Sequence, residues 1–169
     1  AISNLLESQG FNVDKEYYVN DAGRQISILA LSVLLETFKN DIDKEGLYRG
    51  DYIKGLAEKF QKNNLIKKAL KPNVMLSSDT DKRLDQLIKF FQLEKPKVWK
   101  NIQEFSVKEM VKIIKSDLLE MGINHDKWFY ESDVGRFDDT DSLLFQSVNE
   151  IKDKNLTYDL DGAIWFKST

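Results

Sequence analysis

Apolar residues recur every three or four positions along most of the chain, which is the spacing of a helix that buries one face. The pattern predicts helices over residues 2–9, 24–39, 51–62, 65–70, 83–91, 106–121 and 141–154, with a further short segment around Trp99. The 24–39 stretch is apolar nearly all round, so we expect it to be buried on more than one face. Ser106 and Glu109 have the spacing of a capping box, which predicts that a separate helix begins at Ser106.

Other regions change to a strand-like pattern, in which β-branched and aromatic residues are enriched. They are residues 11–19, residues 128–130 and the neighbouring stretches 156–160 and 163–166. Asp161-Gly162 separates the last two stretches and predicts a tight hairpin turn between them. Helices that alternate with strands indicate an α/β fold, in which ligands bind beyond the carboxyl ends of the strands.

The composition narrows the possible chemistry. The chain has 169 residues, a formal net charge of -3, no cysteine and one histidine, His125. The lack of cysteine excludes disulfides, thiol nucleophiles and cysteine-based zinc sites, and a single histidine excludes a histidine-rich metal site. The charge does not indicate strong non-specific binding of nucleic acid. No apolar run is long enough for a transmembrane helix, so we expect no membrane partner.

Both ends of the sequence lie close to predicted elements. The chain starts at Ala1 within a helical pattern and stops at Thr169 directly after a strand-like run. Because domains usually carry a few loose terminal residues, we expect a segment of a longer protein, with removal of an initiating methionine as the alternative. The sequence shows no basic and apolar leader, and we expect a cytoplasmic protein.

Polar side chains follow two of the predicted strands and are candidates for a binding site. Asn20, Asp21 and Gly23 come after the first strand, where a capped turn into the next helix is the alternative. Glu131 and Ser132 come after the aromatic strand, where a solvated strand end is the alternative. At each of these two places, the sequence alone does not decide between a binding site and the structural alternative.

Two further features favour structural roles. His125 lies between a predicted helix and a predicted strand, and a surface or packing role is favoured over catalysis. Asp138, Asp139 and Asp141 could bind a hard cation, but helix capping is favoured because the spaced glycine and terminal glutamate of a calcium loop are missing. The sequence has no glycine-rich phosphate loop, nucleophile elbow or metal motif.

Four strings along the chain resemble motifs of a single enzyme family. Tyr17–Ile26 (YYVNDAGRQI) resembles the segment that follows the first catalytic signature of the arginyl-tRNA synthetases. Tyr48–Ile53 (YRGDYI) and Trp128–Ser132 (WFYES) are similar to its Tyr-x-Gly-[Asp/Glu]-Tyr-[Ile/Val] and Trp-Phe-x-Glu-Ser elements. Asp161–Thr169 (DGAIWFKST) is similar to its Asp-Gly-Ala-x-Trp string. The four strings stand in the family's order, which makes the resemblance specific.

The resemblance implies a class I aminoacyl-tRNA synthetase that activates arginine with ATP, with Mg²⁺ as a further expected cofactor, and transfers the arginine to tRNA(Arg). It implies a partial catalytic domain of the nucleotide-binding, parallel α/β (Rossmann-like) class with a mainly helical insertion. We expect residues 1–47 and 122–169 to be pieces of the α/β core and residues 48–121 to be the insertion. The two ATP signatures of the family do not occur in the chain, so we expect these residues alone to be inactive and to bind no cofactor.

Within this resemblance, Glu131, Asn20 and Asp21 are the expected arginine-pocket residues. A guanidinium group is always charged and presents a planar fork of donors, so its pocket needs carboxylates. Gly23, Gln25, Trp128 and Ser132 belong to the matching strings and are expected to support the motifs. No residue is assigned a catalytic or metal-binding role.

A stand-alone helical module that binds a protein or RNA without catalysis is the alternative function. Its support is the helix-rich middle of the chain and the absence of complete catalytic signatures. Such a module is expected to show polar, capped ends and a basic stripe or an exposed apolar face, and neither is evident in the sequence. For a segment of a synthetase we instead expect weak tRNA binding, and self-association through the apolar sides of 2–9 and 156–166.

Overall fold

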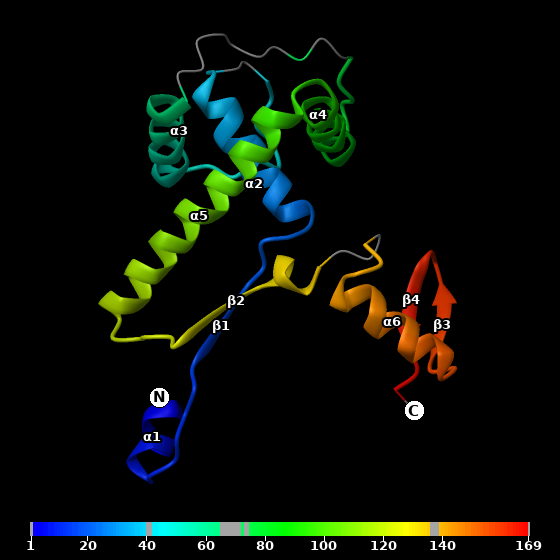
Figure 1. The fold of residues 1–169 in the computed structure, drawn as a ribbon. Coiled ribbons are helices and arrows are strands. Elements are labelled where there is room, and N and C mark those ends of the chain that lie inside the picture. The colour runs from blue at the N-terminus through cyan, green and yellow to red at the C-terminus, as the bar shows by residue number, and fades with distance from the viewer. Residues whose placement is uncertain (1, 40–41, 65–71, 73–74, 136–138, 169) are drawn as a thin grey trace. The chain divides into compact units, whose positions relative to one another are not determined.

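The computed structural model describes residues 2–39, 42–64, 72, 75–135 and 139–168 (Figure 1). Its elements are α1 (Ile2–Ser8), β1 (Glu16–Val19), α2 (Arg24–Thr37), α3 (Asp51–Asn64), α4 (Thr80–Glu94), α5 (Pro96–Glu120), β2 (Lys127–Tyr130), the 3-10 helix η1 (Glu131–Val134), α6 (Leu143–Asp153), β3 (Thr157–Leu160) and β4 (Ala163–Phe166). They form two compact units, a helical unit of Ala22–Asn124 and a mixed unit of Ala1–Asp21 with His125–Thr169. The helix expected over 65–70 lies outside the described residues.

Helix α2 is the centre of the helical unit, where it packs against α3, α4 and α5 (Figure 1). Ten of its fourteen residues are buried, among them Leu31 and Leu34. Phe60 of α3 and Phe91 of α4 are also completely buried in the same core. Each such side chain contributes about 1.5–3 kcal/mol on leaving water. The prediction that the 24–39 segment is buried on more than one face is therefore confirmed.

Helix α5 corrects one sequence-based expectation. The predicted break before Ser106 does not exist, because a single helix runs from Pro96 to Glu120. Pro96 stands at the first helical position, where its missing N–H costs nothing and its fixed φ suits the helix. Ser106 is instead completely buried in the helix interior, and Glu109 is paired with Lys112 and, at 3.1 Å, with Lys59 of α3. The capping-box prediction is wrong because the helix runs unbroken through both residues.

The loop between α2 and α3 approaches α4 closely at Gly46. This residue has a φ of 77°, and a Cβ placed there would lie 2.8 Å from Thr80 Cγ2 and 2.9 Å from Leu84 Cδ1. Helix α4 starts after Asp79, whose side chain accepts a hydrogen bond from the Lys82 backbone N–H, the usual role of an aspartate at this position. The backbone of the loop can lie against α4 only because Gly46 has no side chain.

The mixed unit contains a parallel pair, β1 with β2, and an antiparallel hairpin, β3 with β4. Strand β1 is shorter than the predicted 11–19, because only Glu16–Val19 pair with the four residues of β2. The hairpin predicted at Asp161-Gly162 is confirmed, with φ values of 51° and 76° at these two turn residues. Helix α6 begins after Ser142, whose hydroxyl accepts a hydrogen bond from the Phe145 backbone N–H.

These observations confirm a mixed helix and strand fold with a small parallel sheet. Among the described residues the sheets have two strands each, so the Rossmann-like topology is not confirmed. The two compact units divide the chain at Asp21 and Asn124. Helix α2 belongs to the helical unit because its apolar surface is covered by α3, α4 and α5. Within the described ranges, no helix has the length and apolar character needed to cross a bilayer.

Candidate functional site

The carboxyl ends of β1 and β2 bring together the two polar segments that the sequence singled out. The strands run parallel, and Val19 pairs with Tyr130 at the end of both. Asn20 and Asp21 therefore leave the sheet at the same edge as Glu131 and Ser132, although the two segments are more than 100 residues apart in sequence. This edge is the place where open α/β sheets bind ligands.

A direct contact joins the two segments. One Asp21 carboxylate oxygen accepts a hydrogen bond from the Ser132 backbone N–H at 2.8 Å, and the other accepts one from the Ser132 hydroxyl at 2.5 Å. Charge-assisted hydrogen bonds of this kind are shorter and stronger than those between neutral groups. Ser132 lies in η1, the single 3-10 turn that follows β2 directly. The Asp21 carboxylate therefore fixes the start of η1 to the end of β1.

Tyr18 connects β1 to Glu131, the other candidate on this edge. Desolvation of the Tyr18 phenol, the Glu131 carboxylate beside it and the negative charge of Asp21 all raise the pKa of Tyr18. The Tyr18 ring also stacks on Phe129 of β2, with ring centroids 6.1 Å apart. The Glu131 side chain thus lies beside a phenol O–H, while the residue after it is held by Asp21.

The opposite face of the strand pair is aromatic packing. Tyr17 stacks on Trp128 with ring centroids 4.5 Å apart, and His125 meets both rings edge-on at 5.3 Å and 5.7 Å. The Nδ1 atom of His125 is buried with no hydrogen-bond partner among the described residues. These contacts agree with the packing alternative for His125 and give Trp128 a structural place next to the candidate site.

The remaining motif residues lie in the helical unit. Gly23 is the N-cap of α2, with a φ of 83° and no side-chain cap. Gln25, in the first turn of α2, accepts a hydrogen bond of 2.9 Å from the Tyr48 hydroxyl. This bond connects the first string with the second, Tyr48–Ile53, so both strings help to shape the same helical unit.

Of the acidic cluster, the structure describes Asp139 and Asp141, and among the described residues no group of three or more possible metal ligands is found. Asp139 accepts a hydrogen bond from the Asp141 backbone N–H at 3.1 Å, and the N-cap of α6 is Ser142. Asp138 lies outside the described residues. Asp139 thus orders the turn that leads into α6, while the cap itself is a serine.

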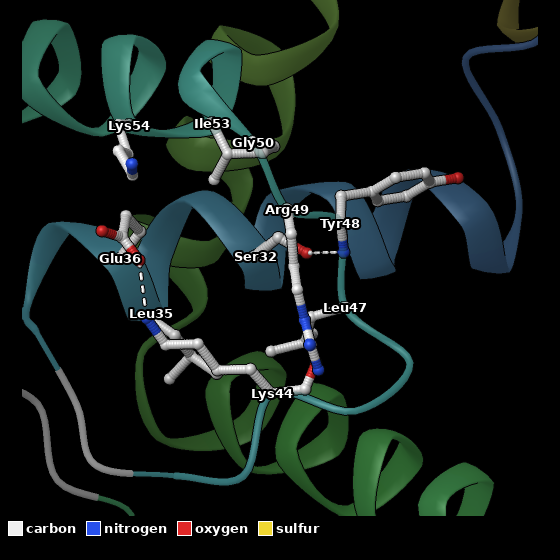
Figure 2. Close-up of a pocket in the computed structure, with 10 residues that line it drawn as sticks. All are labelled: Ser32, Leu35, Glu36, Lys44, Leu47, Tyr48, Arg49, Gly50, Ile53 and Lys54. Carbon is white, nitrogen blue, oxygen red and sulfur yellow. Dashed lines mark hydrogen bonds and ion pairs between the residues drawn. The ribbon is translucent and has the colours of Figure 1, made fainter.

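Sequence analysis did not identify a cavity of about 210 Å³ in the helical unit (Figure 2). It is lined by Ser32, Leu35, Glu36, Lys44, Leu47, Tyr48, Arg49, Gly50, Ile53 and Lys54. Figure 2 shows Lys44 paired with Glu36, at 2.7 Å, and the Tyr48 backbone N–H donating to the Ser32 hydroxyl at 3.0 Å. Four of these residues, Tyr48, Arg49, Gly50 and Ile53, belong to the second resemblance string, which was the only sequence signal for this cavity.

Comparison with known proteins connects the whole chain with one enzyme family. It is 33% identical to an arginine–tRNA ligase of Vesicomyosocius okutanii and 32% identical to one of Coxiella burnetii, in each case over 100% of this chain and 30% of the relative. It is 30% identical to an arginine–tRNA ligase of Acinetobacter baumannii, of which it covers 32%. No family model matches the chain.

The fold is also similar to part of a solved structure. A crystal structure of a putative arginyl-tRNA synthetase from Campylobacter jejuni matches with a TM-score of 0.67 at 23% identity, over 98% of this chain and 31% of that one. The resemblance predicted from the four strings is therefore confirmed along the whole chain. The chain spans about 30% of the length of the relatives it matches, which fits a segment of such an enzyme.

Proposed function

We propose that this chain is a segment of the catalytic domain of an arginine–tRNA ligase and that it supplies one wall of the arginine pocket. The whole protein activates arginine with ATP and Mg²⁺ and transfers it to tRNA(Arg) in the cytoplasm. The parallel strands β1 and β2 belong to a nucleotide-binding, Rossmann-like sheet that other parts of the enzyme complete. Residues 1–47, α2 included, and residues 122–169 contribute to that core, and residues 48–121 form an insertion whose helices α3, α4 and α5 pack on α2.

One observation carries this proposal. Two segments with polar candidates meet at one carboxyl edge of a parallel pair, where Asp21 hydrogen-bonds to Ser132 and Glu131 follows β2 directly. A guanidinium ligand is best recognised by carboxylate oxygens, which accept its parallel N–H donors. Glu131 is the proposed partner of the arginine cation. Asn20, at the end of β1, is placed to bind polar groups of the same substrate.

The residues of this segment do not perform the transfer by themselves. Activation of arginine needs groups that stabilise the leaving phosphates, and the two ATP signatures of the family do not occur in the chain. The role of this segment is to bind and orient arginine, with ATP bound by other parts of the enzyme. We accordingly expect a purified 169-residue chain to show no arginine-dependent pyrophosphate exchange.

The test is Glu131→Gln in the full-length protein that contains this chain. Glutamine keeps the size and shape of glutamate and removes the charge, so a charge-assisted hydrogen bond worth about 1.5–3 kcal/mol is lost. The KM for arginine in tRNA charging should rise roughly 10- to 150-fold, while the KM for ATP changes little.

Glu16→Gln is the matched control. Glu16 is an exposed glutamate at the amino end of the same strand pair, opposite Lys127. Its replacement should leave the KM for arginine unchanged. If E131Q behaves like E16Q, with a KM for arginine within about twofold of wild type, Glu131 has no role in the pocket.

A further inference from the structure

Asp21 directs both of its carboxylate oxygens to a single residue. The bonds from the Ser132 backbone N–H and hydroxyl are 2.8 Å and 2.5 Å long, and each goes to a different oxygen. Asp21 is half-buried, whereas Ser132 is exposed. A carboxylate engaged in this way is oriented toward its partner in the protein, which makes a direct contact with the substrate a poor explanation for its presence.

The held group is the peptide that carries Glu131. The N–H that Asp21 accepts belongs to the peptide bond between Glu131 and Ser132, so its orientation is coupled to the backbone of Glu131. The Glu131 backbone is thus restrained from the end of β1. The Tyr18 phenol of β1 lies near the Glu131 carboxylate, which raises the pKa of Tyr18.

We propose that Asp21 is a positioning residue, which orients the Glu131 carboxylate toward the arginine guanidinium through Ser132 and does not itself bind arginine. This inference rests on the proposed function. In it, Glu131 binds the arginine, and Asp21 holds Glu131 in place. A binding group gains most when it is held in its productive orientation before the ligand arrives. Loss of Asp21 therefore weakens arginine binding only while Glu131 is present to be oriented.

The first experiment is a double-mutant cycle in the full-length protein, with Asp21→Ala, Glu131→Gln and the two combined. D21A should raise the KM for arginine in tRNA charging roughly 3- to 10-fold, since it removes hydrogen bonds that hold a neighbour of the pocket and no bond to the substrate itself. In the E131Q background, D21A should raise the KM for arginine by less than about twofold further, because no charged group is left to orient. If the two effects multiply instead, Asp21 acts on the substrate independently and the proposal is wrong.

Asp21→Asn separates positioning from a direct ionic contact. The amide keeps one oxygen that can accept from the Ser132 N–H, and its NH₂ can donate to the Ser132 hydroxyl. Positioning predicts that D21N raises the KM for arginine less than D21A does. An ionic contact with arginine predicts that D21N weakens binding as strongly as E131Q, and this result would overturn the proposal even if D21A failed to fold.

Hydrogen exchange supplies a readout that does not depend on the enzymatic reaction. D21A should speed exchange of the Ser132 backbone amide roughly 3- to 10-fold, as judged by mass spectrometry of peptides that cover η1. Asp14→Ala is the matched control: Asp14 pairs with Lys127 Nζ at 3.0 Å near the other end of the strand pair, and its loss should leave exchange in η1 unchanged.

The outcomes keep this inference distinct from the proposed function. If the wild-type protein does not charge tRNA with arginine, the proposed function fails, and the hydrogen-exchange result still decides whether Asp21 holds Ser132. If the wild-type protein charges tRNA but E131Q has no effect, Asp21 has nothing to orient and the positioning role fails with the Glu131 role. Unchanged exchange of the Ser132 amide in D21A likewise overturns the proposal.

Discussion

Replacing Ser106 by alanine is expected to stabilise the helical unit. Ser106 lies in the interior of α5 and is 0% exposed. Its Oγ is buried and has no hydrogen-bond partner among the described residues. A buried hydroxyl without a partner costs about 1–3 kcal/mol, because its bonds to water in the unfolded chain are not replaced. Alanine removes this hydroxyl and fits a helix interior at least as well.

Ser116 separates the two effects of this substitution. It is exposed on the same helix, so Ser116→Ala changes helix propensity alone, by about 0.5 kcal/mol. Ser106→Ala has the same effect on helix propensity and also removes the unpaired hydroxyl. The resulting gain in stability is reduced only by the small dispersion energy of one oxygen atom. The free energy of unfolding should therefore rise by about 1–2 kcal/mol more in S106A than in S116A.

The tryptophans allow the measurement to report on the helical unit alone. Trp99 is 4% exposed and lies in its core, while Trp128 and Trp165 belong to the mixed unit. A background of W128F and W165F leaves Trp99 as the sole tryptophan of the chain. Urea unfolding followed by Trp99 fluorescence then gives the stability of the helical unit, and an unchanged m-value shows that the midpoint shift reflects stability.

A result in the opposite direction would refute this reasoning. If S106A is no more stable than S116A, the Ser106 hydroxyl is paired in solution, for example with a carbonyl of the preceding turn or with an internal water molecule. Its removal would then cost a hydrogen bond that offsets the gain in helix propensity.

Two further predictions concern the same helical unit. Hydrogen bonds from Lys112, which has the larger effect, and from Lys59 hold the pKa of Glu109 below its ordinary value of 4.5. Glu109→Gln should therefore destabilise the unit at pH 7. In urea unfolding, the stability difference between wild type and E109Q should disappear as the pH falls from 4.5 through the lowered pKa of Glu109. A stability difference that does not depend on pH would contradict this. Gly46→Ala should lower the free energy of unfolding by about 1–3 kcal/mol more than Gly122→Ala does. Both glycines have positive φ, but of the two only Gly46 has neighbouring atoms that an added Cβ would meet. Equal losses would show that the loop moves away from α4 freely.

Local sequence signals were sufficient for most helices and for the hairpin. The periodicity and the cap residues that define α2, α4 and α6 lie within each helix or next to it, and the Asp161-Gly162 turn is determined by two residues. The error in α5 has a different origin. Ser106 and Glu109 are compatible with a helix start, but contacts with residues far away in sequence, such as Lys59, made them part of a helix interior.

Sequence identified the residue types at the candidate site but not how they are paired. Asp21, Glu131 and Ser132 were each singled out because they follow strand-like runs. The bonds between Asp21 and Ser132 could not be predicted, since they depend on which strands are neighbours and on their register. The cavity beside Tyr48 was missed for the same reason: its lining comes from α2, α3 and the loop between them.

The register of β1 and β2 therefore determines the geometry of the candidate site. In a hairpin the turn sets the register, but here the connection is the whole helical unit, Ala22–Asn124, which is too long to do so. The register is instead set by contacts between the two segments, and among these the Tyr17–Trp128 and Tyr18–Phe129 pairs face each other across the strands and are stacked. A slip of one residue would displace Ser132 from Asp21 by about 3.3 Å, enough to break both hydrogen bonds. The aromatic residues of the WFYES string thus act at the site indirectly, by holding two distant segments in the one alignment that lets Asp21 reach Ser132.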